Sequence, residues 1–104
     1  MRLGAHLSIA KGLDKTVNMA ANIGANTFQF FTRNPRGGAA RQISEQEIST
    51  WKQARQAADL YPIAGHLPYT LNLGAADTRQ QEFARMVLHD DARRIAALGG
   101  EFLI

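Results

Sequence analysis

The chain has 104 residues, of which 45% are hydrophobic and 20% are charged, and this composition excludes a disordered protein. It contains no cysteine, which excludes a disulfide framework and a thiolate metal site. Twelve Lys and Arg residues against nine Asp and Glu residues give a net charge of +3, which is too small to identify a partner. No segment approaches the roughly 18 consecutive apolar residues of a membrane span, and no basic leader precedes an apolar stretch. We therefore expect a cytoplasmic protein without a membrane partner.

The spacing of apolar residues changes repeatedly along the chain between the period of a strand and that of a helix. Residues 2–7 predict a short strand. Residues 12–23 predict a helix, and Gly24 predicts its end, because glycine adopts the left-handed conformation of a helix terminus without strain. Residues 27–31 (TFQFF) are rich in residues that favour strands and predict a second strand.

A second helix is predicted after a long loop over residues 32–43. Ser44 and Glu47 stand three positions apart, so each side chain can bind the free backbone N–H group of the other residue in a capping box. One face of the helix that follows is apolar, with an arginine whose stem can cover apolar surface. That face comprises Ile48, Trp51, Ala54, Arg55 and Ala58.

The last part of the chain predicts a strand, a long helix and another strand. Residues 61–65 are a weak third strand, in which Pro62 fits only near the start. After a loop over residues 66–77, residues 78–98 predict an amphipathic helix, and residues 101–104 a fourth strand. We expect the buried face of the long helix to comprise Phe83, Met86, Val87, Ile95 and Leu98.

The order β-α-β-α-β-α-β indicates an α/β fold, since strands separated by helices pair in parallel through right-handed crossovers. The strands begin roughly 33 residues apart, and eight such units total about 260 residues, the usual size of a TIM (β/α)8 barrel. A doubly wound sheet is the alternative, but the Gly-rich or acidic site it would place after the first strand is not present. We expect residues 1–104 to be the N-terminal part of a barrel, cut within the fourth strand, with no second domain. A four-stranded half barrel that dimerises is the alternative.

The strand ends are where the working residues of a TIM barrel lie. The first three predicted strands end in residues 6–8 (HLS), 31–36 (FTRNPR) and 66–72 (HLPYTLN). His66 is the best candidate for a metal ligand, although a lone histidine more often has a structural, hydrogen-bonded role, and no HExxH or similar cluster is present. The role of His6 is open in the same way. It can be a metal ligand, a phosphate contact or a hydrogen-bond donor beside a metal.

Arginines gather in the loop after the second predicted strand. Residues 29–44 include Arg33, Arg36 and Arg41 and no acidic residue. Phosphate is a natural partner of such a segment, and a solvated basic loop is the alternative. From the residues alone, we therefore predict a TIM barrel that uses metal or phosphate.

Three further polar residues are open to two readings. Tyr69 can stack on a substrate or form a hydrogen bond with it. Asn72 can either contact a substrate or hold its loop in an Asx turn. His89 stands beside two aspartates within the long predicted helix, so we expect it to lie on the surface or to pack.

The motifs at these strand ends resemble a known family. Residues 4–8 (GAHLS), 31–36 (FTRNPR) and 66–74 (HLPYTLNLG) are similar, in order and spacing, to three successive motifs of the endonuclease IV family, the family-2 apurinic/apyrimidinic endonucleases, also called deoxyribonuclease IV. The resemblance covers the whole chain. It implies a xylose isomerase-like TIM barrel with three zinc ions, a monomer that cleaves double-stranded DNA on the 5′ side of abasic sites in base excision repair.

The resemblance also implies roles for individual residues. His66 would be a zinc ligand, and His6 would lie at the floor of the site near the metals. Arg36 would belong to a loop that penetrates the DNA at the lesion, and Tyr69 to a loop that lines the flipped-out abasic nucleotide. The DNA-contacting residues would be Arg33, Asn34, Arg36 and Tyr69.

The chain departs from the family pattern in ways that limit these expectations. Lys11-Gly12 stands where many members have two glycines, and Gly37-Gly38 stands where many have an aromatic residue after the loop arginine. The other metal ligands of the family lie on strands beyond Ile104, so we expect no certain catalytic residue and no activity in these 104 residues alone. A sugar isomerase or epimerase of the same superfamily is an alternative, and a non-catalytic half barrel that acts as an interaction module is another.

Overall fold

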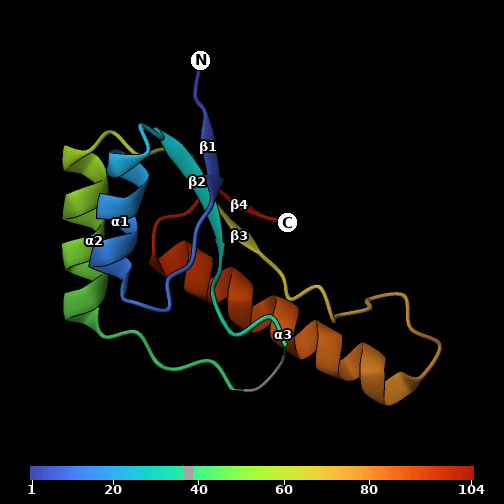
Figure 1. Ribbon diagram of the computed structural model, residues 1–104. Helices are drawn as coiled ribbons and strands as arrows, with labels where there is room; N and C mark the ends of the chain where they lie inside the picture. Colours follow the sequence, from blue (N-terminus) through green and yellow to red (C-terminus); the bar gives the residue numbers. More distant parts are fainter. Residues whose placement is uncertain (37–38) are drawn as a thin grey trace.

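The computed structural model describes residues 1–36 and 39–104, which form a parallel four-stranded sheet and three helices (Figure 1). The Gly37-Gly38 pair of the predicted loop lies outside the described residues. Strands and helices alternate in the predicted order. They are β1 (Gly4–His6), α1 (Leu13–Asn22), β2 (Thr27–Phe31), α2 (Glu45–Ala57), β3 (Ile63–His66), α3 (Thr78–Ala97) and β4 (Phe102–Leu103).

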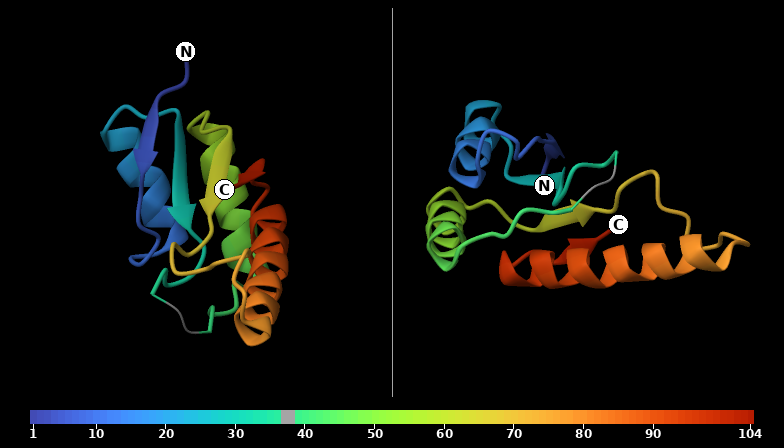
Figure 2. Two further views of the ribbon diagram at one scale, coloured as in Figure 1. Left: turned by 90° about the vertical axis from the view of Figure 1, so that its right-hand side faces the viewer. Right: turned by 90° about the horizontal axis from the view of Figure 1, so that it is seen from below.

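The strands lie in the sheet in the same order as in the chain, β1-β2-β3-β4, and every neighbouring pair is parallel. Successive right-handed crossovers in one direction put all connecting helices on the same face of the sheet. Figure 2 shows α1, α2 and α3 on one side of the sheet, with the other side open. A doubly wound sheet would reverse its strand order and cover both faces. The described strands therefore have the arrangement of a barrel segment, as predicted.

The core lies between the sheet and the helices. Phe28 and Phe30 alternate with outward residues along β2, as the period of a strand requires, and their rings lie 5.7 and 5.6 Å from the ring of Trp51 on α2. All three side chains are buried, and the Trp51 Nε1–H donates to the Leu98 carbonyl at 3.0 Å. In β3, the lack of a side chain at Gly65 makes room for α3, since a Cβ there would lie 2.3 Å from Ile95.

The ends of the elements agree with the predictions to within two residues. Gly24 follows the last residue of α1 by two positions and has a φ of 72°, the left-handed conformation expected at a helix end. β1 is shorter than residues 2–7, and β3 begins at Ile63 because Pro62 has no N–H group for the ladder.

The buried face of α3 differs from the predicted one. Phe83 and Met86 are 50% and 59% exposed, so their assignment to the core was wrong, whereas Val87, Ile95 and Leu98 are buried. Each of the two exposed residues precedes a buried position by one, which places it about 100° around the helix from that buried position. The buried stripe of the helix is made of Ala84, Val87, Asp91 and Ile95.

Arg55 does more than cover apolar surface with its stem. It is buried, and its guanidinium donates to the carbonyls of Leu98 and Gly99 and to the Glu101 carboxylate. These bonds attach α2 to the turn between α3 and β4.

No helix within residues 1–36 and 39–104 has the length and apolarity needed to cross a membrane.

The capping box predicted at the start of α2 is present. The Glu47 N–H donates to Ser44 Oγ at 3.1 Å, and the Ser44 N–H donates to Glu47 Oε2 at 3.0 Å. Hydrogen bonds from Arg41 and from the Ser44 backbone lower the pKa of Glu47 from 4.5 to about 2. Because the folded-state pKa lies below the ordinary value, the contribution of Glu47 to stability is present above pH 4.5 and is lost as the pH falls to about 2.

Replacing Ser44 with Ala is expected to lower the free energy of unfolding by about 1 kcal/mol, because the backbone N–H of Glu47 loses its acceptor. The measurement is urea denaturation followed by far-UV circular dichroism at neutral pH. Ser49 is exposed within the same helix, so Ser49→Ala is the control and should leave stability within about 0.5 kcal/mol of the unchanged chain. Equal effects of the two substitutions would show that the cap contributes nothing.

Candidate active site at the strand ends

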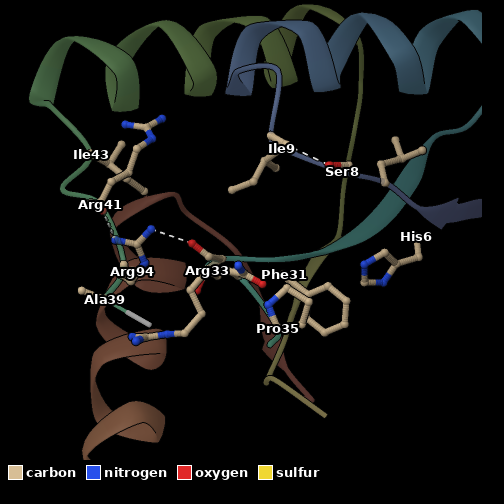
Figure 3. Close-up of a pocket in the computed structure, with 15 residues that line it drawn as sticks. His6, Ser8, Ile9, Phe31, Arg33, Pro35, Ala39, Arg41, Ile43 and Arg94 are labelled. Atoms are coloured by element: carbon tan, nitrogen blue, oxygen red, sulfur yellow. Dashed lines mark hydrogen bonds between the residues drawn. The ribbon is translucent and has the colours of Figure 1, made fainter. Parts of the chain in front are cut away.

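Two histidines and a phenylalanine meet at the C-terminal ends of β1, β2 and β3. The ring centroid of Phe31 lies 4.6 Å from that of His6 and 4.9 Å from that of His66, and the two imidazole centroids are 6.0 Å apart. Phe31 stands opposite His66 in the sheet register, and it faces the side opposite to the buried Phe30. The structure therefore brings together, on the open face, Phe31 and the two histidines that the sequence singled out. Figure 3 shows one of these histidines, His6, beside Phe31.

The hydrogen bond of His66 determines which ring nitrogen can bind a metal. Its Nδ1 lies 2.5 Å from the Leu67 carbonyl oxygen, which can only accept a hydrogen bond. Nδ1 must therefore hold the proton, and the lone pair of the neutral ring is on Nε2. A ligating histidine has this arrangement, in which a carbonyl holds one nitrogen and the other is free for the metal.

His6 has the opposite arrangement. The Gln29 amide nitrogen donates to His6 Nδ1 at 3.0 Å, which leaves the proton of the neutral imidazole on Nε2. Burial, and secondly the proximity of His66, lower the pKa of His6 below its ordinary value of 6.5, so the neutral form predominates at pH 7. His6 therefore presents an N–H donor beside the lone pair of His66.

The donor set tests whether these residues fit a metal ion. His66 fits as one ligand, since a neutral imidazole is a ligand that zinc prefers. Within residues 1–36 and 39–104, no group of three or more His, Cys, Asp or Glu side chains is placed to hold an ion. A structural or catalytic zinc site needs at least three protein ligands, so the described residues supply part of such a site.

Arg33, which the sequence predicts to contact DNA, is held by ion pairs within the chain. Its side chain is 6% exposed, its Nε donates to Asp91 at 2.7 Å, and its guanidinium also pairs with Asp90. These ion pairs hold two of its three guanidinium nitrogens, Nε and Nη2, within the chain. Arg33 therefore anchors the loop that it belongs to, and the sequence prediction missed this because both acids lie on α3, far along the chain.

Arg36 and Asn34 lie further along the loop between β2 and α2. Asn34 Oδ1 accepts a hydrogen bond from the Arg36 N–H at 3.0 Å, which makes a tight turn. Arg36 is exposed, and among the described residues no carboxylate pairs with its guanidinium. The turn thus presents an exposed cation at the mouth of the site.

The loop after β3 lies beside this turn. Thr70 Oγ1 donates to the Pro35 carbonyl at 3.1 Å and so joins the two loops. Tyr69 is 63% exposed, and its ring stands at 70° to that of Phe31, with centroids 6.2 Å apart. Asn72 Oδ1 accepts from the Gly74 N–H at 3.0 Å, which confirms the Asx-turn interpretation of this residue.

The structure also contains features that the sequence reading missed. Asp91 and Arg94 of α3 bind the loop after β2, and Gln29 sets the tautomer of His6. An acid in the buried stripe of a helix was the available signal, since a buried carboxylate requires a partner. His89 lies exposed on the same helix, as predicted.

A cavity of about 520 Å³ lies between the loops after β1 and β2 and α3 (Figure 3). Apolar side chains and the stems of arginines form most of its wall. The labelled residues of the wall include Ser8, Ile9, Arg33, Arg41, Ile43 and Arg94.

Comparison with known proteins agrees with this architecture. The family model described as "Xylose isomerase-like TIM barrel" matches residues 17–104. A curated relative, "Probable endonuclease 4" of Moorella thermoacetica, is 75% identical over the whole chain, which covers 37% of that protein. The crystal structure of endonuclease IV from Thermus thermophilus matches with a TM-score of 0.93 and 35% identity over 99% of this chain and 39% of that one.

A more distant match shows the fold alone. The structure of D-allulose 3-epimerase from Methylomonas sp. has a TM-score of 0.62 and 20% identity over 98% of this chain and 36% of that one. In all of these matches the chain spans a little over a third of the length of the similar protein. The chain therefore belongs to the xylose isomerase-like TIM barrel family, within which it is similar along its whole length to endonuclease 4.

Proposed function

We propose that the chain is the N-terminal part of a zinc-dependent endonuclease that hydrolyses the DNA backbone on the 5′ side of abasic sites. This enzyme would act in base excision repair and would be located in the cytoplasm. The observation on which this proposal depends is the pair of strand-end histidines, which are neutral and in opposite tautomers. One presents a lone pair and the other an N–H group on the same open face. The relatives named endonuclease 4 support the nuclease class.

His66 would hold zinc through Nε2, the nitrogen left free by the Leu67 carbonyl. Zinc, when bound, supplies Lewis-acid chemistry that polarises a phosphate and an attacking water. His6 Nε2–H would donate to a phosphate oxygen near the floor of the site. The further ligands would come from the part of the protein beyond this chain, so the 104 residues alone would be inactive, and the full-length protein would act as a monomer.

The two loops would contact DNA that contains an abasic site. Arg36 would pair with phosphate or enter the groove, with its direction set by the turn at Asn34. Tyr69 would line the space taken by the flipped-out abasic nucleotide, where its exposed ring offers an apolar surface to the sugar. Extrusion costs least where the base is already missing, which favours abasic DNA as the substrate.

A hybrid enzyme provides the test of this proposal. It is the Moorella thermoacetica endonuclease 4 in which the matching segment is replaced by this chain, a change of a quarter of the segment's residues at 75% identity. If the proposal is correct, the hybrid enzyme cleaves an abasic duplex and loses this activity to a chelator. A hybrid enzyme that binds the duplex without cleaving it would instead support a non-catalytic interaction module.

Arg36→Ala in the hybrid enzyme is expected to weaken binding of an abasic duplex by about three- to tenfold and to reduce the salt slope by about one, the effect of losing one phosphate contact. Fluorescence anisotropy at several salt concentrations measures both quantities. Zinc content should stay the same, because Arg36 has no contact with His66. Arg85→Ala, on the exposed face of α3, is the matched loss of charge. A fall in zinc content without a change in DNA affinity would remove Arg36 from the DNA surface.

A further inference from the structure

The first residues of the loop between β2 and α2 bind a buried carboxylate on a helix that follows later in the chain. Asp91 of α3 is fully buried, and its Oδ1 accepts hydrogen bonds from Thr32 Oγ1 at 2.8 Å and from Arg33 Nε at 2.7 Å. The loop leaves the sheet at these two residues. The carboxylate therefore fixes the direction in which the loop begins.

Arg94, one turn further along α3, binds both ends of the same loop. One terminal nitrogen donates to the Thr32 carbonyl at 2.6 Å, and the other donates to the Arg41 carbonyl at 2.7 Å. Figure 3 shows the Arg94 side chain between those of Arg33 and Arg41. A planar guanidinium donates from fixed directions, so a single side chain sets the separation of the two ends of the loop.

Stability alone does not explain why the charges of Asp91 and Arg33 are buried. A buried ion pair is often no more stable than a well-packed apolar pair of the same size, because each charge must be taken out of water. Hydrogen bonds differ from apolar contacts because they are directional. Each of these bonds therefore fixes the position of one particular atom of the loop. The loop residues held between these bonds include Asn34 and Arg36, which form the turn at the mouth of the site.

We propose that Asp91 and Arg94 are positioning residues that hold the loop after β2 in the arrangement that presents Arg36 to DNA. The inference rests on the proposed function for the identity of the partner, but the holding of the loop is independent of it. Arg33 contributes to the same attachment of the loop, since its ion pairs with Asp91 and Asp90 join the loop to α3. Thr70 adds a third attachment through the Pro35 carbonyl.

Limited proteolysis tests the holding of the loop without any DNA. Trypsin cleaves after Arg36 and Arg41, and mass spectrometry gives the rate of cleavage at each bond in the hybrid enzyme. Arg94→Gln is expected to raise these rates by about tenfold or more, because the loss of hydrogen bonds to a charged group shifts local opening by at least that factor. Arg93→Gln, the exposed neighbouring position, should leave both rates unchanged. Equal rates in the two variants would overturn the proposal.

Steady-state kinetics on an abasic duplex tests the consequence for the site. Arg94→Gln is expected to raise KM by about tenfold with a smaller change in kcat and with unchanged zinc content, since the loop binds DNA and the metal ligand lies on β3. Arg94→Lys should recover part of the loss, because an ammonium group can reach one of the two carbonyls. If Arg94→Gln does not fold, Arg94→Lys is compared with Arg93→Lys in both measurements.

The two measurements separate the possible failures. A fall in kcat with unchanged KM and unchanged cleavage by trypsin would contradict the positioning role. If the hybrid enzyme without any further substitution neither binds nor cleaves abasic DNA, the proposed function fails, whereas the protease result still decides whether Arg94 holds the loop.

Discussion

Replacing His66 with Ala in the hybrid enzyme is expected to reduce cleavage of an abasic duplex by more than about a hundredfold, since even residues that only orient a metal ligand affect metal affinity or activity by 10- to about 100-fold. The structural reason is that His66 Nε2 has a free lone pair, whereas His6 Nδ1 accepts a hydrogen bond from Gln29. Zinc bound per molecule should fall in parallel. Initial cleavage rates and zinc content by atomic emission are the two measurements.

His89→Ala is the matched control, because His89 is exposed on α3 and does not lie at the strand ends. It should leave the cleavage rate and the zinc content unchanged. Cleavage that survives in His66→Ala with full zinc content would show that the metal is held without this residue. The assignment of His66 as a ligand would then be wrong.

The largest effect on stability is expected at Trp51, where substitution by Ala should lower the free energy of unfolding by about 3–5 kcal/mol. Trp51 is fully buried, its ring contacts those of Phe28 and Phe30 edge-on, and its Nε1–H bonds to the Leu98 carbonyl. The substitution therefore leaves a cavity between α2 and the sheet, and it also leaves a buried carbonyl with one partner fewer. Urea denaturation followed by far-UV circular dichroism measures the effect, since the variant lacks the chain's single tryptophan.

Phe83→Ala provides the control for this substitution, because Phe83 is a large apolar residue that is half exposed. Its effect on the free energy of unfolding should stay within about 0.5 kcal/mol in the same chain. If Phe83→Ala destabilised the chain as strongly as Trp51→Ala, the face of α3 that packs on the sheet would be the one that the sequence predicted.

The regular elements could be predicted because each has a periodic signal that local physics imposes. Residues 27–31 alternate between a buried and an open face, and the predicted strand has the observed bounds. Ser44 and Glu47 formed the capping box that their spacing indicated. The buried face of α3 could not be found in the same way, because Phe83 and Met86 suggested a stripe by size, whereas the residues that are buried include the smaller Ala84 and the charged Asp91.

The candidate site was predictable only as far as strand ends define it. His6 and His66 were identified because the C-terminal ends of parallel strands meet at one edge of a sheet. Their different tautomers depend on Gln29 and on the Leu67 carbonyl, which no spacing in the sequence indicates. Arg33 was assigned to the DNA surface because its own loop contains no acid, while its actual partners are distant in the chain and approach only in the folded structure.

The position of the cut in an abasic duplex tests the central claim most directly. The hybrid enzyme is incubated with an end-labelled duplex that contains one abasic site, with and without a chelator, and the labelled fragment is sized beside that from the unchanged Moorella thermoacetica protein. We predict a single cut on the 5′ side of the abasic site that the chelator abolishes. If the unchanged protein makes this cut and the hybrid enzyme leaves the strand intact, or cuts it elsewhere, the function proposed for this chain is wrong.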